Sequence, residues 1–156
     1  MWRVRISAKT DYAIRAALEL AATPAQAWIK TEAVAERQSI PLPFLLNILA
    51  ELRTAGLVQS RRGADGGYRL ARPPSSITLA DVIRAIDGPL ANIAGEVPEN
   101  VEYDGAAVAL REVWIALRAQ MRTVLESVSL SDAAAGHLPF EVTHLLKDQD
   151  VWQVRR

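Results

Sequence analysis

The sequence predicts a mainly α-helical protein with a small β-hairpin wing, arranged as a winged helix-turn-helix followed by a long dimerisation helix. Three observations predict this fold class. Two short helical segments, residues 29–37 and 44–55, are separated by a turn that contains two prolines. A hairpin pattern over residues 57–70 follows directly, with arginines and glycines at its tip. Farther along the chain, apolar residues recur at helical spacing from residue 110 to residue 128.

The first three helices follow from caps and apolar spacing. Ser7 or Thr10 can cap a first helix that runs to about Ala22, and Thr31 is a suitable N-cap for the second. In the third helix one apolar face is expected to be buried, with Leu45, Ile48, Leu49 and Leu52 on it. The opposite face then carries Phe44, Asn47, Glu51 and Thr54, which are left for solvent or a ligand.

The hairpin is expected to pair residues 57–60 with residues 67–70, and Gly66 and Gly67 give the backbone freedom for the turn. The proline-rich stretch 72–76 is a stiff linker and the best candidate for a domain boundary. We therefore expect a DNA-binding domain over residues 1–75 and a helical dimerisation and effector region over residues 76–156.

The second half contains a capped helix, an acidic loop and a long apolar seam. Thr78 caps a helix that ends near Ile86, and residues 88–104 form the acidic loop. The seam consists of residues spaced alternately four and three apart: Leu110, Trp114, Leu117, Met121, Val124 and Val128. Such a seam is poorly buried against one small domain, so we expect a homodimer interface, although part of it could pack on the first helix.

Composition narrows the function further. The net charge is zero, but residues 1–75 hold 11 lysines and arginines against 6 acidic residues, and residues 76–156 hold 7 against 12. This asymmetry fits a DNA-reading half joined to an acidic half. The chain has no cysteine, which excludes disulfides and thiolate metal sites. No stretch approaches the ~20 apolar residues of a membrane helix, and no secretory signal is recognisable, so we expect a cytoplasmic protein without a membrane partner.

Double-stranded DNA is the partner that these patterns indicate. The Asn47 amide can pair with an adenine edge, and Phe44 can contact a thymine methyl group. Lys9, Thr31 and Arg53 are placed to hold phosphates. Arg61 and Arg62, at the hairpin tip, have the position of arginines that enter a minor groove. Each residue also has an ordinary alternative as a core, surface or solvated residue, and the interpretation depends on the arrangement as a whole.

Several segments together resemble the Rrf2 (IscR-like) family of bacterial regulators. They are Arg5-Ile6-Ser7-Ala8-Lys9, Pro43-Phe44-Leu45, residues 52–58, Arg62-Gly63-Ala64-Asp65-Gly66-Gly67-Tyr68-Arg69-Leu70, and residues 77–88. The likeness covers residues 5–88 closely and continues through the long helix near Trp114. It implies a homodimer with crossed long helices whose two winged modules read a pseudo-palindromic operator. The DNA contacts that it implies are Ser7, Lys9, Pro43, Phe44, Asn47, Arg62 and Gly63.

The chain also departs from the family pattern. Many members carry three cysteines in the loop before the long helix and hold an iron–sulfur cluster there, whereas residues 88–104 contain none. Arg111 stands where an IscR-type protein offers a histidine, and Leu46 where it offers a glutamate. We therefore expect a cysteine-free member with no cofactor or metal, because a cluster held by oxygen and imidazole donors alone is a poor match to iron–sulfur chemistry.

The sequence bears on three classes of function. The first is a DNA-binding transcriptional regulator, a repressor, that is modulated by a small-molecule or protein effector. The second is a protein-interaction module that docks to a partner through its acidic loop or C-terminal tail. The third, an enzyme, is not expected, because no activated nucleophile, paired carboxylates, phosphate loop or metal-ligand spacing is recognisable.

The start of the chain carries one further hypothesis. Members of the family begin close to Arg5-Ile6-Ser7, so residues 1–3 resemble an extension. The hypothesis is that translation begins at the codon for Val4, read as methionine. The intact mass of the protein from its native source tests it, and a mass that includes Trp2 and Arg3 would contradict it.

Overall fold

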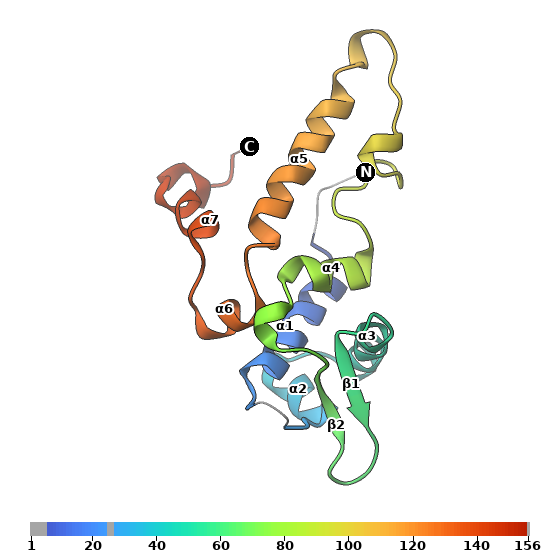
Figure 1. Cartoon of the computed structure of the whole chain (residues 1–156), viewed down its shortest axis with the longest axis vertical. Helices are drawn as coiled ribbons and strands as arrows, with labels where there is room; N and C mark the ends of the chain where they lie inside the picture. The colour runs from blue at the N-terminus through green and yellow to red at the C-terminus, as the bar shows by residue number, and fades with distance from the viewer. Residues whose placement is uncertain (1–5, 25–26, 156) are drawn as a thin grey trace.

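A computed structural model of the chain describes residues 6–24 and 27–155 (Figure 1). The hypothesis about Val4 concerns residues outside this part and stays a hypothesis. The molecule is elongated: helices α1 to α4 and a hairpin gather at one end, and α5 extends away from them (Figure 1). The described residues form a mainly helical fold with one hairpin, in agreement with the predicted fold class.

The first two helices begin close to their predicted starts. α1 (Ala8–Ala22) is capped by Ser7, whose hydroxyl oxygen accepts a hydrogen bond from the backbone N–H of Thr10 at 3.1 Å. α2 (Thr31–Gln38) is preceded by Lys30 as its N-cap, and no side chain in the described part of the chain caps it. The predictions of a helix from residue 29 and of a cap at Thr31 were therefore wrong. The physical reason is that Ile29 pairs with Tyr68 of the hairpin and is held in extended conformation.

α3 (Leu42–Thr54) begins two residues earlier than predicted. Pro43 fits in its first turn because the N–H groups there have no partner within the helix. The predicted buried face is confirmed: its four apolar residues, Leu45, Ile48, Leu49 and Leu52, are at most 1% exposed. This burial fixes which side of α3 faces away from the core.

The hairpin consists of β1 (Val58–Arg61) and β2 (Gly67–Leu70), which pair antiparallel with Arg61 opposite Gly67. Ile29 extends this pairing by donating to the Tyr68 carbonyl at 2.9 Å and accepting from the Tyr68 N–H at 2.8 Å. Gly67 has φ +142°, and a Cβ atom there would lie 2.1 Å from the Ile29 carbonyl oxygen. The glycine is thus required by the close approach of the two segments as well as by the turn.

One hydrophobic cluster joins these elements to segments from the second half. α4 (Leu79–Asp87) begins with the predicted cap at Thr78, in a reciprocal capping box with Asp81. α6 (Leu130–Ala135) packs against α1. Ile77, Val82 and Leu130 belong to the same cluster as the buried residues of α1 and α3. The division of the chain at residue 75 stays a prediction, and the core packing runs across it.

α5 (Leu110–Leu125) contains no buried residue. It follows a loop with short 3-10 turns at Pro98–Asn100 and Gly105–Ala107, and it contacts the first of them. The last regular helix is α7 (Phe140–Thr143), followed by 3-10 turns at Leu145–Lys147 and Gln149–Trp152. Within the described ranges no helix is long and apolar enough to cross a membrane.

Val128 differs from its prediction as part of the apolar seam. The helix ends at Leu125, and Val128 lies beyond it with an exposed fraction of 3%. Its carbonyl oxygen accepts a hydrogen bond from the Leu79 N–H at 3.0 Å. Its side chain is already buried in a single chain, so it is removed from the predicted dimer interface.

Candidate nucleic-acid interface

The outward face of α3 carries large side chains that the protein leaves in solvent. Phe44 is 62% exposed and Leu46 is 48% exposed, and Pro43 and Asn47 are also exposed. Exposed apolar side chains beside an exposed amide on one helix are suited to contact with another molecule. The prediction that this face is available to a ligand agrees with this exposure.

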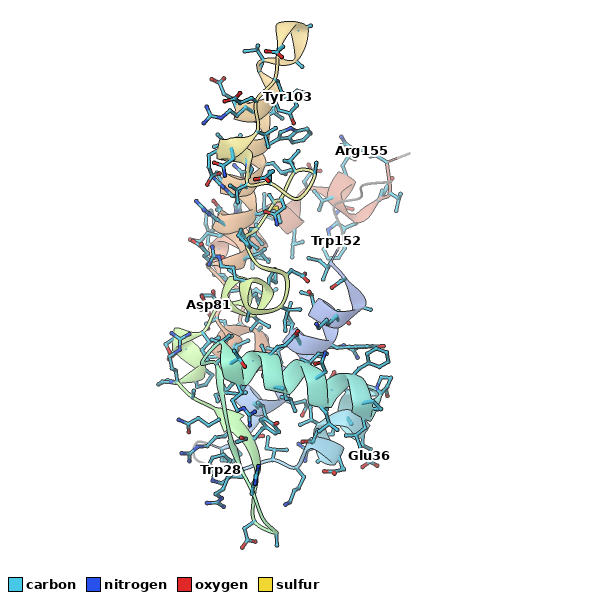
Figure 2. The ribbon with its side chains drawn as sticks, turned by 90° about the vertical axis from the view of Figure 1, so that its right-hand side faces the viewer. Trp28, Glu36, Asp81, Tyr103, Trp152 and Arg155 are labelled. Atoms are coloured by element: carbon cyan, nitrogen blue, oxygen red, sulfur yellow. The ribbon has the colours of Figure 1, made fainter. Side chains whose placement is uncertain are left out.

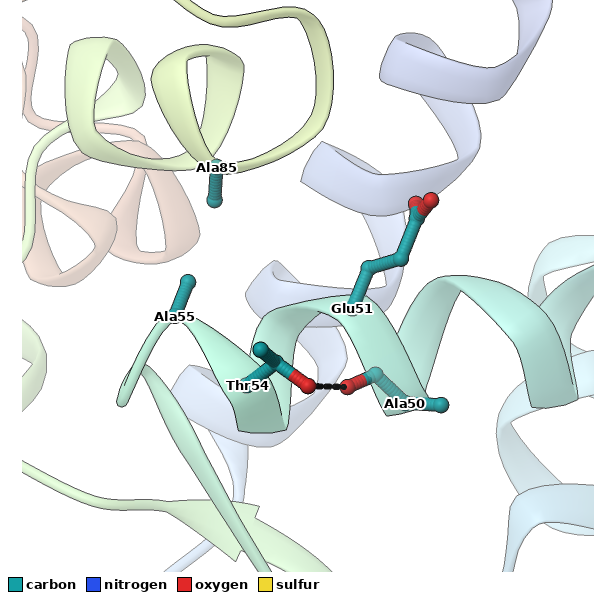
Figure 3. Close-up of a pocket in the computed structure, with 5 residues that line it drawn as sticks. All are labelled: Ala50, Glu51, Thr54, Ala55 and Ala85. Atoms are coloured by element: carbon teal, nitrogen blue, oxygen red, sulfur yellow. Dashed lines mark hydrogen bonds between the residues drawn. The ribbon is translucent and has the colours of Figure 1, made fainter.

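Glu51 does not extend outward with Phe44 and Asn47. Its Oε1 accepts from the Lys9 ammonium group at 2.8 Å, which ties α3 to the start of α1. A hollow of about 330 Å³ lies beside Glu51. Small residues at the end of α3 and Ala85 of α4 line it with Glu51 (Figure 3). Its second oxygen, Oε2, is buried and accepts no hydrogen bond from the described residues. Lys9, a predicted phosphate contact, is therefore partly neutralised in the free protein.

The other predicted phosphate contacts differ in accessibility. Arg53 is exposed, and its Nη1 donates to the Ser60 hydroxyl at 3.0 Å, which links α3 to the hairpin. Ser7 is half-buried at the start of α1. Thr31 is only 8% exposed, and this burial weighs against a phosphate contact by its side chain.

The two arginines at the hairpin tip are not equivalent. Arg62 is exposed and makes no hydrogen bond or ion pair with any residue that the structure describes. Arg61 is also exposed, but its Nη2 donates to the Asp65 carbonyl oxygen at 2.5 Å. The Gly63 carbonyl oxygen accepts from the Lys30 ammonium group at 2.8 Å. Arg61 is thus held within the hairpin, and the entry of either arginine into a minor groove stays a prediction.

Sequence reasoning missed Trp28, Lys30 and Arg69 as residues of this surface. Trp28 lies beside the hairpin (Figure 2), within reach of the guanidinium groups of Arg61 and Arg69. The alternation of the strands could have placed Arg61 and Arg69 on one face. No local signal, however, indicates which tryptophan approaches them, because that contact joins segments distant in the sequence.

The loop before α5 is fastened to that helix by side chains. Arg118 pairs with the Glu99 carboxylate at 2.5 Å, and Arg111 donates to the Glu99 carbonyl oxygen at 3.0 Å. The Trp114 indole N–H donates to the Tyr103 hydroxyl at 2.9 Å. The backbone N–H of Glu99, and after it the Arg118 guanidinium, hold the pKa of the Glu99 carboxyl below its ordinary value.

A family model described as "Rrf2, iron-dependent transcriptional regulator" matches residues 6–136. The donor set needed for an iron–sulfur cluster is absent from this chain, which has no cysteine. Nor do the described residues gather three or more histidine, aspartate or glutamate side chains that could hold a metal ion. The loop that precedes α5 therefore does not fit an iron centre of that kind.

Relatives of this chain are transcriptional regulators by name. A Mycobacterium tuberculosis protein of the HTH-type regulator class is 48% identical over 145 residues, which cover 93% of this chain and 90% of the relative. The HTH-type transcriptional regulator CymR of Bacillus subtilis is 36% identical, with 85% of this chain and 91% of CymR covered. None of these names describes an enzyme or a protein-docking module, and the docking alternative is not favoured.

Solved structures agree with this relationship. The structure of B. subtilis CymR, described as the global cysteine regulator, matches with a TM-score of 0.73 and 34% identity, covering 86% of this chain and 98% of CymR. The structure of T. potens IscR matches with a TM-score of 0.67 and 31% identity, covering 98% and 93%. The match in family, sequence and fold extends over most of the molecule. The chain belongs to the Rrf2 family of transcriptional regulators.

Proposed function

We propose that this regulator binds a pseudo-palindromic operator as a homodimer and represses transcription there, without an iron–sulfur cluster. In each copy, the outward face of α3 reads bases in the major groove, and Arg62 at the hairpin tip enters the neighbouring minor groove. Pro43, Phe44 and Asn47 make the contacts of α3, and Ser7, Lys9 and Arg53 position the module on phosphates. Repression follows from occupancy, because a dimer on its operator excludes other proteins from the same DNA.

The observation that carries the DNA-reading proposal is the link between α3 and the hairpin. Arg53 of α3 donates to Ser60 of β1, so the exposed helix face and the hairpin are held in one orientation. A fixed orientation favours binding because the protein loses less conformational entropy when the interface with DNA forms. The positive balance of residues 1–75 supplies the phosphate attraction.

The homodimer proposal rests on α5. This helix of 16 residues buries none of them in its own chain. Leu110, at the start of the seam, is 38% exposed, and Val113, which borders the seam beside Trp114, is 51% exposed. Trp114, Leu117, Met121 and Val124, on the same seam, are only half-buried. An apolar seam of this length is buried most simply against the same seam of a second copy.

Capture of genomic fragments by the purified protein at about 150 mM salt tests the proposal, because non-specific phosphate binding is suppressed there. We expect recovery of an inverted repeat. Asn47→Ala should relax the base preference, and Arg62→Ala should weaken binding about tenfold. Lys147→Ala removes one positive charge from the exposed C-terminal segment and is the matched control. Unchanged binding by both interface variants would overturn the assignment of α3 and the hairpin tip.

Repression is tested separately from binding. Transcription in vitro from a promoter that contains the recovered repeat should fall as the protein is added. A rise in transcription would identify an activator and contradict this part of the proposal. The same assay can screen small molecules and proteins as effectors, since a true effector changes the protein concentration needed for half-maximal repression.

A further inference from the structure

Trp28 holds two arginines of the hairpin at once. The guanidinium carbon of Arg61 lies 4.8 Å from the centroid of the Trp28 ring, and that of Arg69 lies 4.2 Å from it. Both distances are within the range of cation–π attraction, for which tryptophan is the best of the aromatic side chains. Trp28 itself is half-buried and comes from the connection between α1 and α2, outside the hairpin.

The segment that carries Trp28 is attached to the hairpin at two further points. Ile29 exchanges two backbone hydrogen bonds with Tyr68, at 2.9 and 2.8 Å. Lys30 donates to the Gly63 carbonyl oxygen at the hairpin tip. The backbone that carries Trp28 is therefore held in place beside both strands, and the indole ring contacts the two arginines from there.

The two arginines would otherwise repel each other. In the register of the hairpin, Arg61 lies opposite Gly67 and Arg69 lies opposite Gln59, so both arginines are on one face. The ring face of Trp28 attracts both cations, the Asp65 carbonyl accepts from Arg61, and the Gln59 side chain accepts from Arg69 at 3.2 Å. These contacts hold two positive charges together on an exposed surface.

We infer that Trp28 is a positioning residue that presents Arg61 and Arg69 as a preformed pair to adjacent phosphates of the DNA backbone. The inference rests on the proposed function and deepens it. The arginines of the hairpin then have two different roles. Arg61 and Arg69, held by Trp28, contact phosphates of the DNA backbone, and Arg62 enters the minor groove. Preformed side chains lose less conformational freedom on binding, so affinity rises without any contact between Trp28 and DNA.

A mutant cycle on the full-length protein tests this inference with the captured operator as probe. Trp28→Leu should weaken operator binding about 5- to 20-fold, and Trp28→Phe by less, because phenylalanine keeps a weaker ring face. The slope of log K against log salt should become less negative by about one to two units in Trp28→Leu, as phosphate contacts are lost. Trp152→Leu, at an exposed tryptophan in the C-terminal segment, is the control and should leave both quantities unchanged.

The decisive comparison repeats Trp28→Leu in an Arg61→Ala/Arg69→Ala background. If Trp28 acts through the arginines, its substitution there should change affinity less than about twofold. An equal loss in both backgrounds would mean that Trp28 contacts DNA or supports the fold directly, and would overturn the inference. No loss in either background would overturn it as well.

Two further controls separate this inference from its premises. Circular dichroism of each variant shows whether the fold is retained, and Trp28→Phe carries the test if Trp28→Leu is unfolded. Wild-type protein that binds no operator contradicts the proposed function, whereas wild-type binding with unaffected Trp28 variants contradicts only the role of Trp28.

Discussion

The two ends of this molecule differ in where their apolar side chains are buried. At the winged end, α1, α3 and the hairpin share a cluster whose central side chains are less than 2% exposed. At the other end, α5 has an equally regular apolar pattern and buries no residue fully. The contrast shows that apolar periodicity predicts that a helix face becomes buried. It does not indicate whether the same chain or a second molecule covers that face. The winged end is complete in one chain, and α5 is completed, in our proposal, by a second copy.

The substitution with the largest expected effect is Leu52→Ala, which tests whether the core of the winged end is complete in one chain. Leu52 is fully buried in α3, so its truncation should lower the free energy of unfolding by about 2–5 kcal/mol. Urea denaturation at a fixed protein concentration measures this loss. Leu146→Ala, at a residue 38% exposed near the C-terminus, should cost less than about 0.5 kcal/mol. Equal losses in the two variants would remove the contrast between buried and exposed positions.

The corresponding test of α5 is Val113→Glu. Val113 borders the apolar seam, and a carboxylate buried there without a partner should raise the dimer dissociation constant about 100-fold. Sedimentation across a concentration series measures it. Ala119→Glu adds the same charge at an exposed position on the side of α5 away from Leu117, and should leave the dimer intact. A Val113→Glu protein that still dimerises like the wild type would place the interface elsewhere.

Glu51→Gln examines whether the winged end restrains its own DNA binding. The substitution removes a negative charge beside the surface that we propose for DNA and releases Lys9 from its ion pair. We expect operator binding to tighten about threefold, with a salt slope steeper by about one unit. Glu112→Gln makes the same charge change on α5 and should have no such effect. Weaker binding by Glu51→Gln would show that the pair orients Lys9 for DNA instead of withholding it.

The smallest effect concerns the loop that precedes α5. An NMR titration should give Glu99 a pKa below its ordinary value of 4.5, and Arg118→Gln should raise that pKa without abolishing the shift, since the Glu99 backbone N–H contributes first. Because the folded pKa is the lower one, the ionised carboxylate stabilises the fold above the unfolded pKa. This stabilisation is lost as pH falls through the folded pKa. An ordinary pKa in the wild type would argue that the loop is not held on α5 in solution.

Local signals predicted much of this structure. The cap at Thr78 and the buried face of α3 follow from residue type and spacing alone, and of the two caps predicted for α1, Ser7 or Thr10, the structure has Ser7. The exposed positions of Phe44 and Asn47 follow from the same periodicity, because the face opposite a buried stripe must lie outside. These predictions succeeded because each depends on residues within a few turns of one another.

Several of the failures involve contacts between distant segments. Ile29 was predicted to be helical, but its pairing with Tyr68 overrides local preference. Val128 continues the apolar spacing of α5 after the helix has ended, and it is the core that buries it. The approach of Trp28 to Arg61 and Arg69, and of Glu51 to Lys9, depends on how three helices and a hairpin meet. The residue pattern within one helix or strand does not indicate how that element packs against the others.

The return of α6 to α1 has a consequence for how the protein is made. Leu130 fills the same cluster as Leu45 and Leu52, and its N–H donates to the Ile77 carbonyl oxygen at 2.8 Å. During synthesis from the N-terminus, this residue leaves the ribosome only after the whole of α5 has been made. A nascent chain that stops within α5 contains the surface that we propose for DNA recognition but lacks part of the core beneath it. The core of the winged end can therefore be completed only after α5, the helix that we propose for dimerisation, has been synthesised. A chain that stops within α5 has an incomplete core and an incomplete dimer seam.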